Sequence, residues 1–374
     1  MIKNKEYLRI PGPTPIPPRV MKAMSSTIIY HRSVEFGSVI NETVENAKKV
    51  FKTSGDVLIF SASGRGVMEA TLVNIVSPGE KVLILINGEF GEIFADIAKN
   101  FRAQVERLEF PKGEAVDIEC FEDYIRKNKS IKAVLAIHCE TSTGVVNDVE
   151  DIGKIASKYG VLSIIDAVSS LGGIELSMDK WGIDFVLSAS QKCLMTPPGL
   201  GLVAVSPRAW KAVEESTNSR YYWDFRRYRE YQNKVPKQTP FTSPVSLMIG
   251  LNEALNMIDQ EGIDNVLRRH REVAKILRSK IKNIGLELFP KKEEWCSNTV
   301  TAVKSPEGME SGLLIKALQE RFNLRIANGL GNLEDKIFRV GHMGYQAEEL
   351  EAVAVAWAIK SIIDEVRKQK ENIK

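Results

Sequence analysis

Short aliphatic runs alternate with segments of helical period from about residue 57 to residue 205, and no other feature constrains the fold as strongly. The runs are strand-sized and show no alternation of polar with apolar residues, which is typical of strands covered on both faces. They lie at residues 57–60, 82–86, 133–137, 161–165, 185–187 and 202–205. Between them apolar residues recur at helical spacing, as in Ile93, Ile97 and Phe101. This alternation predicts a parallel α/β sheet with right-handed crossovers and with ligands at the carboxyl ends of its strands.

The pattern changes at about residue 245, where two helices are expected in succession. The second is the longer and carries Val266, His270, Val273 and Leu277 on one stripe, so we expect His270 to be packed in the core. A smaller α+β unit follows. Its strands are expected near residues 300–303, 324–326 and 337–340, and its closing helix from about 347 to 367.

The opening segment contains five prolines between residues 11 and 18, and these exclude a helix that runs through them. We expect an extended arm that lies over another surface. The chain is therefore predicted to have three parts: an arm at residues 1–20, a large α/β domain at 21–255 and a smaller α+β C-terminal domain at 256–374.

Charge and cysteine content exclude several classes of function. Lys and Arg number 51 against 48 Asp and Glu, and they are scattered, whereas a nucleic-acid-binding protein shows a concentrated basic face. The four cysteines are far apart and form no CxxC pair, so neither a zinc site nor a disulfide framework is indicated. No apolar run approaches the roughly 20 residues that cross a bilayer, and the N-terminus lacks the apolar core of a signal peptide. We expect a cytoplasmic protein with no metal, nucleic-acid or membrane partner.

Three expected strand ends carry polar groups. The first is Ser63-Gly64-Arg65-Gly66, where Ser63 is a natural N-cap for a helix that extends to about Val76. The free amides of such a helix start attract phosphate, although a capped turn that binds nothing has the same sequence.

The other two strand ends carry Asp166 and Lys192. Asp166 could hold a metal, a ribose or a protonated ring nitrogen, or it could cap the next turn. Burial of Lys192 would lower its pKa and make it a nucleophile for a Schiff base, whereas a lysine that extends to solvent would have no such role. Pyridoxal phosphate has a phosphate, a ring nitrogen and an aldehyde, and so it matches all three strand ends together.

With these residues the chain resembles the class V aminotransferases of the fold-type I pyridoxal-phosphate enzymes, most closely the alanine–glyoxylate and serine–pyruvate aminotransferase branch. The matching motifs occur in family order over nearly the whole chain. They lie at residues 11–14, 31–33, 63–66, 87–91, 138–144, 166–173, 190–192, 239–244 and 339–341. The resemblance implies a large, mostly parallel sheet domain and a smaller C-terminal domain.

The resemblance also implies a reaction and a set of site residues. The reaction is ping-pong transamination between a small amino acid, such as alanine or serine, and a 2-oxo acid such as glyoxylate or pyruvate. Lys192 and Asp166 are the implied catalytic residues, and Arg339 and Gly12 the implied substrate-binding residues. The implied cofactor-binding residues are Ser63, Gly64, Arg65, Phe90, Thr141, Asp166, Ser169, Gln191 and Lys192, with Thr239 and Thr242 of a homodimer reaching the neighbouring subunit's phosphate.

Other functions stay open at this point. A different amino donor such as aspartate, or a lyase or cysteine desulfurase on the same fold, would use the same cofactor chemistry. A desulfurase needs a mobile cysteine ahead of the small-domain strands, and only Cys296 is a candidate. A catalytically silent scaffold is the alternative of another class. The roles of His31 and Arg32, and a redox role for Cys193, are not decided by the sequence.

Overall fold

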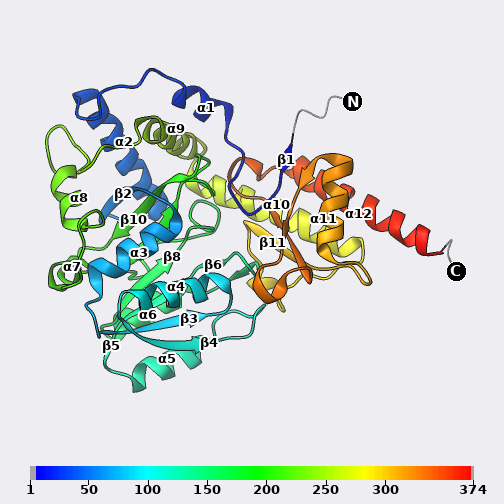
Figure 1. Cartoon of the computed structure of the whole chain (residues 1–374), viewed down its shortest axis with the longest axis horizontal. Coiled ribbons are helices and arrows are strands. Elements are labelled where there is room, and N and C mark those ends of the chain that lie inside the picture. Colours follow the sequence, from blue (N-terminus) through cyan, green and yellow to red (C-terminus); the bar gives the residue numbers. More distant parts are fainter. Residues whose placement is uncertain (1–5, 372–374) are drawn as a thin grey trace.

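The computed structural model describes residues 6–371, so residues 1–5 of the predicted arm lie outside the described part. A seven-stranded sheet in the order β2-β10-β9-β8-β5-β3-β4 forms the centre of the larger part (Figure 1). Its strands are β2 (Asp56–Ala62), β3 (Lys81–Ile86), β4 (Gln104–Glu109), β5 (Ile131–Ile137), β8 (Leu162–Asp166), β9 (Phe185–Ala189) and β10 (Gly199–Val205). All six predicted runs are strands of this sheet.

The prediction that every strand is parallel is wrong for β10, which is antiparallel to both β2 and β9. Nine residues, 190–198, connect β9 to β10, and a parallel crossover needs a dozen or more. The chain therefore turns back on itself. The mostly parallel sheet expected from the resemblance is confirmed.

Strand β4 was not predicted, because its sequence QVERLE carries four charged or polar residues and only two apolar ones, Val105 and Leu108. It pairs only with β3 and forms the edge of the sheet. Edge strands are commonly charged, since charge prevents pairing with other molecules.

Helices cover both faces of the sheet, and alternate strand residues contribute to two separate cores. One face is packed against α2 (Val34–Phe51), α5 (Ile118–Lys127), α6 (Val149–Lys158) and α9 (Val245–Glu261). The other is packed against α3 (Gly64–Ile75), α4 (Glu89–Asn100), α7 (Trp210–Glu215) and α8 (Phe225–Gln232). Burial on both faces explains the continuous aliphatic runs.

The C-terminal part, yellow to red in Figure 1, has its own core and a three-stranded antiparallel sheet. Its elements are α10 (Ile263–Asn283), β11 (Val300–Lys304), α11 (Ser311–Phe322), β13 (Ala327–Asn328), β14 (Ile337–Gly341) and α12 (Glu349–Glu371). Helix α10 contributes Val266 to a core of the larger part and Val273 to the C-terminal core. The boundary at residue 255 stays a prediction.

The strand expected near residues 324–326 is present but ends at Arg325, and the chain changes partner after it. Strand β12 (Leu324–Arg325) pairs with β1 (Tyr7–Leu8) of the arm, and β13 pairs with β14. Ile326 lies between them and packs into the core.

From β1 the arm continues across the C-terminal sheet, where the amide of Gly341 donates to the carbonyl of Arg9 at 2.7 Å. Helix α1 (Pro18–Met24) begins at the last proline. Proline is tolerated in the first turn because the amides of that turn have no hydrogen-bond acceptor within the helix. The arm therefore lies over the C-terminal part before the chain enters the larger part.

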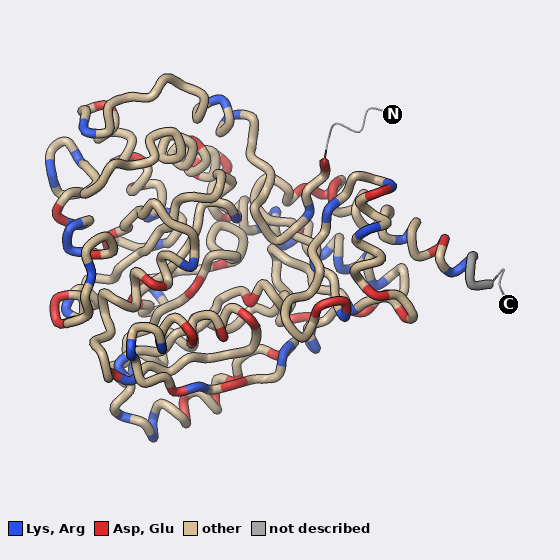
Figure 2. Tube along the Cα trace, in the orientation of Figure 1, with Lys and Arg blue, Asp and Glu red and all other residues tan. Residues whose placement is uncertain are grey.

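Charges of both signs are mixed along the trace of both parts (Figure 2). Among the helices of residues 6–371, none is long and apolar enough to span a membrane.

Candidate active site

The three predicted strand ends meet at one cavity of about 290 Å³ at the carboxyl edge of the sheet. Its lining residues are Ser63, Gly64, Arg65, Met68, Phe90, Ile137, Cys139, Thr141, Asp166, Val168, Ser169, Gln191 and Lys192. Nine of these are residues that the sequence predicted for the site. These residues are far apart in the sequence. The parallel strands bring them together, because the carboxyl ends of the strands lie at one edge of the sheet.

Helix α3 begins at the cavity, directly after β2. Ser63 is its N-cap, as predicted, and its hydroxyl accepts from the amide of Gly66 at 3.4 Å. Gly64 and Arg65 form the first turn, where amides and the helix dipole favour a bound anion. The start of α3 in the cavity wall is therefore suited to an anion such as a phosphate.

Asp166 is the last residue of β8, and its carboxylate accepts from the amide of Val168 at 2.7 Å. Burial raises the pKa of Asp166 to about 7; the hydrogen bond from Val168 opposes this rise, and the nearby charge of Glu140 adds to it. A cationic partner, such as a protonated ring nitrogen, would stabilise the ionised form.

Lys192 lies in the turn after β9, and the exposed part of its side chain lines the cavity. Burial lowers its pKa to about 8, so much more of the amine is neutral at physiological pH than for an ordinary lysine. Its Nζ donates to the main-chain carbonyl of Pro11, and Thr14 Oγ1 donates to the carbonyl of Lys192 at 3.0 Å. The N-terminal arm therefore contacts Lys192 through Pro11 and Thr14. Nothing in the sequence predicted this contact.

Gly12 is in direct contact with Lys192. Its φ is +108°, in the region that favours glycine, and a Cβ built there would lie 2.6 Å from Cδ and 2.9 Å from Nζ of Lys192. No side chain fits at this position without displacing the lysine. Gly12 does not line the cavity itself.

Arg339 lies on β14 beside the cavity and is 6% exposed. Its Nε and Nη2 donate to the carbonyl of Asn328 at 2.9 and 2.7 Å, and its Nη1 to the carbonyl of Thr141 at 3.0 Å. Within the described chain these partners are all main-chain carbonyls, not carboxylates. Burial lowers the pKa of Arg339 to about 10, and the charge of Glu140 opposes that fall. A buried guanidinium of this kind is suited to an anionic ligand.

Other predicted residues complete the cavity wall. Thr141 Oγ1 donates to Ser169 Oγ at 2.6 Å, and Phe90 lines the cavity from the first turn of α4. The side-chain oxygen of Gln191 is buried and has no hydrogen-bond partner in the described chain. A buried polar atom without a partner fits a cavity wall that contacts a polar ligand.

Thr239 and Thr242 do not line this cavity. Thr239 Oγ1 donates to the carbonyl of Phe241 at 2.7 Å, and Thr242 is exposed beside His31 in a separate surface hollow. Their predicted role concerns a neighbouring subunit, and it stays a prediction.

Cys139 and Glu140 had no predicted role. Cys139 lines the cavity, and burial raises the pKa of its thiol to about 11. Glu140 is fully buried just behind the wall. Their place directly after a predicted strand, within the matched motif 138–144, was the available signal.

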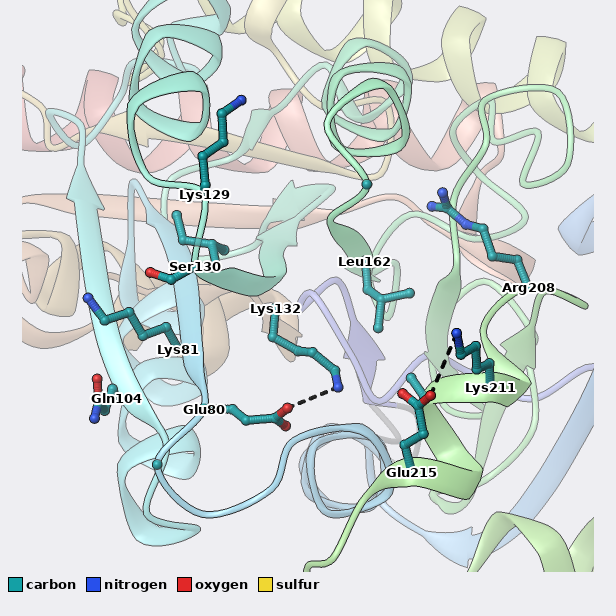
Figure 3. A pocket seen from close by; sticks show the side chains of 14 residues that line it. Glu80, Lys81, Gln104, Lys129, Ser130, Lys132, Leu162, Arg208, Lys211 and Glu215 are labelled. Atoms are coloured by element: carbon teal, nitrogen blue, oxygen red, sulfur yellow. Dashed lines mark hydrogen bonds and ion pairs between the residues drawn. The ribbon is translucent and has the colours of Figure 1, made fainter.

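A larger hollow of about 630 Å³ lies at the opposite edge of the sheet (Figure 3). It is rich in lysine, but Lys132 pairs with Glu80 at 3.0 Å and Lys211 with Glu215 at 3.7 Å. It lies at the amino ends of the strands, away from the residues described above, and paired surface charges give no reason to place chemistry there.

Comparison with known proteins agrees with this geometry. An alanine–glyoxylate aminotransferase from Nostoc sp. superposes with a TM-score of 0.92 at 30% identity, covering 97% of this chain and 96% of that one. A ureidoglycine–glyoxylate aminotransferase from Bacillus subtilis superposes with a TM-score of 0.93 at 28% identity, covering 98% and 94%. The architecture is that of the fold-type I transferases, a class of enzymes that use pyridoxal phosphate.

The chain belongs to the aminotransferase class-V family, whose model matches residues 6–334. A protein of Methanocaldococcus jannaschii named as an uncharacterized aminotransferase is 40% identical, over 92% of this chain and 89% of its own. The soluble hydrogenase 42 kDa subunit of Anabaena cylindrica is 39% identical, over 92% and 90%. The serine–glyoxylate aminotransferase of Methylorubrum extorquens is 38% identical, over 96% and 92%.

Proposed function

We propose that this protein is a pyridoxal-phosphate-dependent aminotransferase that moves amino groups between a small amino acid, such as alanine or serine, and a 2-oxo acid such as glyoxylate or pyruvate. The observation that carries the proposal is the meeting of Lys192, Asp166 and the start of α3 at one cavity. The names of the Nostoc and Methylorubrum relatives support glyoxylate as acceptor, with alanine or serine as donor.

Bound pyridoxal phosphate would supply an aldehyde that condenses with amines and a protonated ring that accepts electrons from the substrate Cα. Gly64 and Arg65 would bind its phosphate through their amides, with Ser63 and Gln191 beside them. Asp166 would face the ring nitrogen and Phe90 the ring. The phosphate and the ring nitrogen would thus be held by different residues, which would fix the orientation of the cofactor.

Lys192 would hold the cofactor covalently and, once released by the substrate amine, would move the proton of the substrate Cα. Its lowered pKa favours this role, because the neutral amine is the base. Arg339 would bind the substrate carboxylate with the two N–H groups that its carbonyl partners leave available. Gly12 keeps the space beside Lys192 free of side chains.

We also infer a homodimer in which Thr239 and Thr242 reach the neighbouring subunit's phosphate. Both lie outside the cavity of their own chain, and Thr242 is exposed, as this role requires.

The test of the proposed function is Lys192→Ala, which should abolish transamination and the visible absorbance of lysine-bound cofactor. A panel of alanine, serine and aspartate with glyoxylate and pyruvate, compared by kcat/KM, then identifies the substrates. Turnover of the variant at the wild-type rate would contradict the proposal. Release of sulfide from cysteine would indicate a desulfurase, and a wild type that binds no cofactor would indicate a scaffold.

A further inference from the structure

Glu140 is a buried carboxylate to which the proposed reaction assigns no role. It is 0% exposed and lies in the short strand β6 (Cys139–Glu140), just beyond the carboxyl end of β5. Burial raises its pKa, and hydrogen bonds from Ser142, Gly91 and Phe90 oppose that rise. The groups that form hydrogen bonds with Glu140 all act as donors, as an ionised carboxylate requires.

Glu140 accepts hydrogen bonds from the first turn of α4 and from Ser142. The amides of Phe90 and Gly91 donate to Glu140 Oε2 at 3.1 and 3.3 Å. The amide and hydroxyl of Ser142 donate to Oε1, and Ser142 Oγ in turn accepts from the amide of Glu89 at 3.1 Å. Glu140 and Ser142 therefore occupy the first three amides of the helix.

Helix α4 has no side-chain cap of its own, because Gly88 stands at its N-cap position. A Cβ built on Gly88 would lie 2.4 Å from Cδ of Glu140 and 2.6 Å from Oγ of Ser142. The carboxylate from a distant segment thus occupies the place of the usual capping side chain.

This cap is adjacent to the proposed site on two sides. Phe90, whose amide donates to Glu140, lines the cavity. Thr141, the next residue after Glu140, binds Ser169 through its hydroxyl and Arg339 through its carbonyl. A shift of Glu140 would therefore move the ring that faces the cofactor, and the contact to Arg339 with it.

We propose that Glu140 is a positioning residue that fixes the ring of Phe90 against the cofactor through the first turn of α4. The inference rests on the proposed function, because it assigns Phe90 to the cofactor ring. Glu140 itself touches neither substrate nor cofactor in this assignment.

The test compares Glu140→Gln with the wild type in two measurements that need no turnover: the Kd of the apoprotein for pyridoxal phosphate, and the circular dichroism of the bound cofactor. Glutamine keeps the shape but turns one oxygen into a donor that faces other donors. We expect the Kd to rise about tenfold, and the dichroism per bound cofactor to fall because the ring is held less firmly.

Asp184→Asn is the matched control. Asp184 is a buried carboxylate, 1% exposed, that accepts from the amide of Ser163 at 3.0 Å and pairs with Arg208. It precedes β9, at the edge of the sheet away from Lys192. Its variant should lower the melting temperature and leave the Kd and the dichroism of the bound cofactor at wild-type values.

Phe90→Leu, alone and with Glu140→Gln, tests whether Glu140 acts through Phe90. The double variant should bind the cofactor no more than about twofold more weakly than Phe90→Leu alone, since residues acting through one another are not additive. Ser142→Ala removes the second half of the cap. It should weaken binding in the same direction, and it decides the test if Glu140→Gln does not fold.

Wild-type Kd and dichroism in both cap variants, or additive effects with Phe90→Leu, would overturn the role of Glu140 and leave the proposed function standing. A wild-type protein that binds no pyridoxal phosphate would overturn both.

Discussion

Burial shifts the pKa values of Lys192 and Asp166 in opposite directions, and the two side chains line one cavity. The pKa of Lys192 falls to about 8 and that of Asp166 rises to about 7, because a low-dielectric site disfavours the charged form of each. Pairs of titratable groups displaced in this way are found at functional sites. The amine is therefore prepared to react near neutral pH.

The reaction of the apoprotein with pyridoxal phosphate should report the pKa of Lys192. Only the neutral amine attacks an aldehyde, so the rate should rise with pH, with a midpoint near 8, and then level off. Stopped-flow absorbance of the lysine-bound cofactor measures this rate. Lysine blocked at its α-amine is the control, and its rate should continue to rise to about pH 10.4. The same continued rise in the protein would contradict the assignment.

Arg339→Lys should separate substrate binding from cofactor binding. Lysine retains the positive charge but lacks the planar fork that holds a carboxylate by two parallel bonds. We expect KM for the amino acid to rise about tenfold or more, equivalent to about 1.4 kcal/mol. Steady-state kinetics measure the change, and the cofactor spectrum should match the wild type. An unchanged KM would place the carboxylate elsewhere.

At the scale of elements, α10 is tied to the turn that follows β14 by one neutral histidine. His270 Nδ1 lies 2.7 Å from the carbonyl of Val266 and must donate to it, so Nε2 accepts from the amide of Gly344 at 2.9 Å. Burial lowers the pKa of His270 to about 4. The prediction that His270 is core-packed is confirmed, since it is 0% exposed.

This arrangement predicts a loss of stability in mild acid. Below about pH 6.5 the unfolded chain binds a proton at His270, whereas the folded chain does not until about pH 4, so stability falls as pH falls through this window. His138, with a folded pKa of about 4, and His342, with one of about 3, act in the same direction.

His270→Gln removes one of these titrating groups while its side-chain oxygen can still accept from Gly344. Between pH 6.5 and 5 the variant should lose about 2 kcal/mol less stability than the wild type, at about 1.4 kcal/mol per pH unit. Urea unfolding of the apoprotein at several pH values measures both. Identical pH dependence would show that His270 does not contribute.

At the scale of the whole molecule, the inferred dimer makes each site depend on two chains. Lys192→Ala removes the lysine from a chain's own cavity. The double variant Thr239→Ala, Thr242→Ala removes the two threonines that a chain would contribute to its partner's cavity. Mixed subunits should regain activity, because a heterodimer contains one site with both sets intact. Refolding the two variants together and separately, followed by activity assays, measures this; no gain on mixing would contradict shared sites.

Much of the fold was predictable because it depends on local patterns. Aliphatic runs and helical periods are properties of adjacent residues, and the six predicted strands and His270 follow from them. Strand β4 was missed because an edge strand needs no apolar run. The direction of β10 was misjudged, although the short link at residues 190–198 contained the signal.

The chemistry of the cavity was predictable from single segments of the chain: a helix start at Ser63, an acid at Asp166 and an amine at Lys192, each at a strand end. The groups that surround them depend on how the chain folds: the carbonyl of Pro11 accepts from Lys192, and Glu140 accepts from the amide of Phe90. The reason is physical. These contacts join residues 50 to 181 positions apart, and long-range packing leaves no periodic trace in the segments that it brings together.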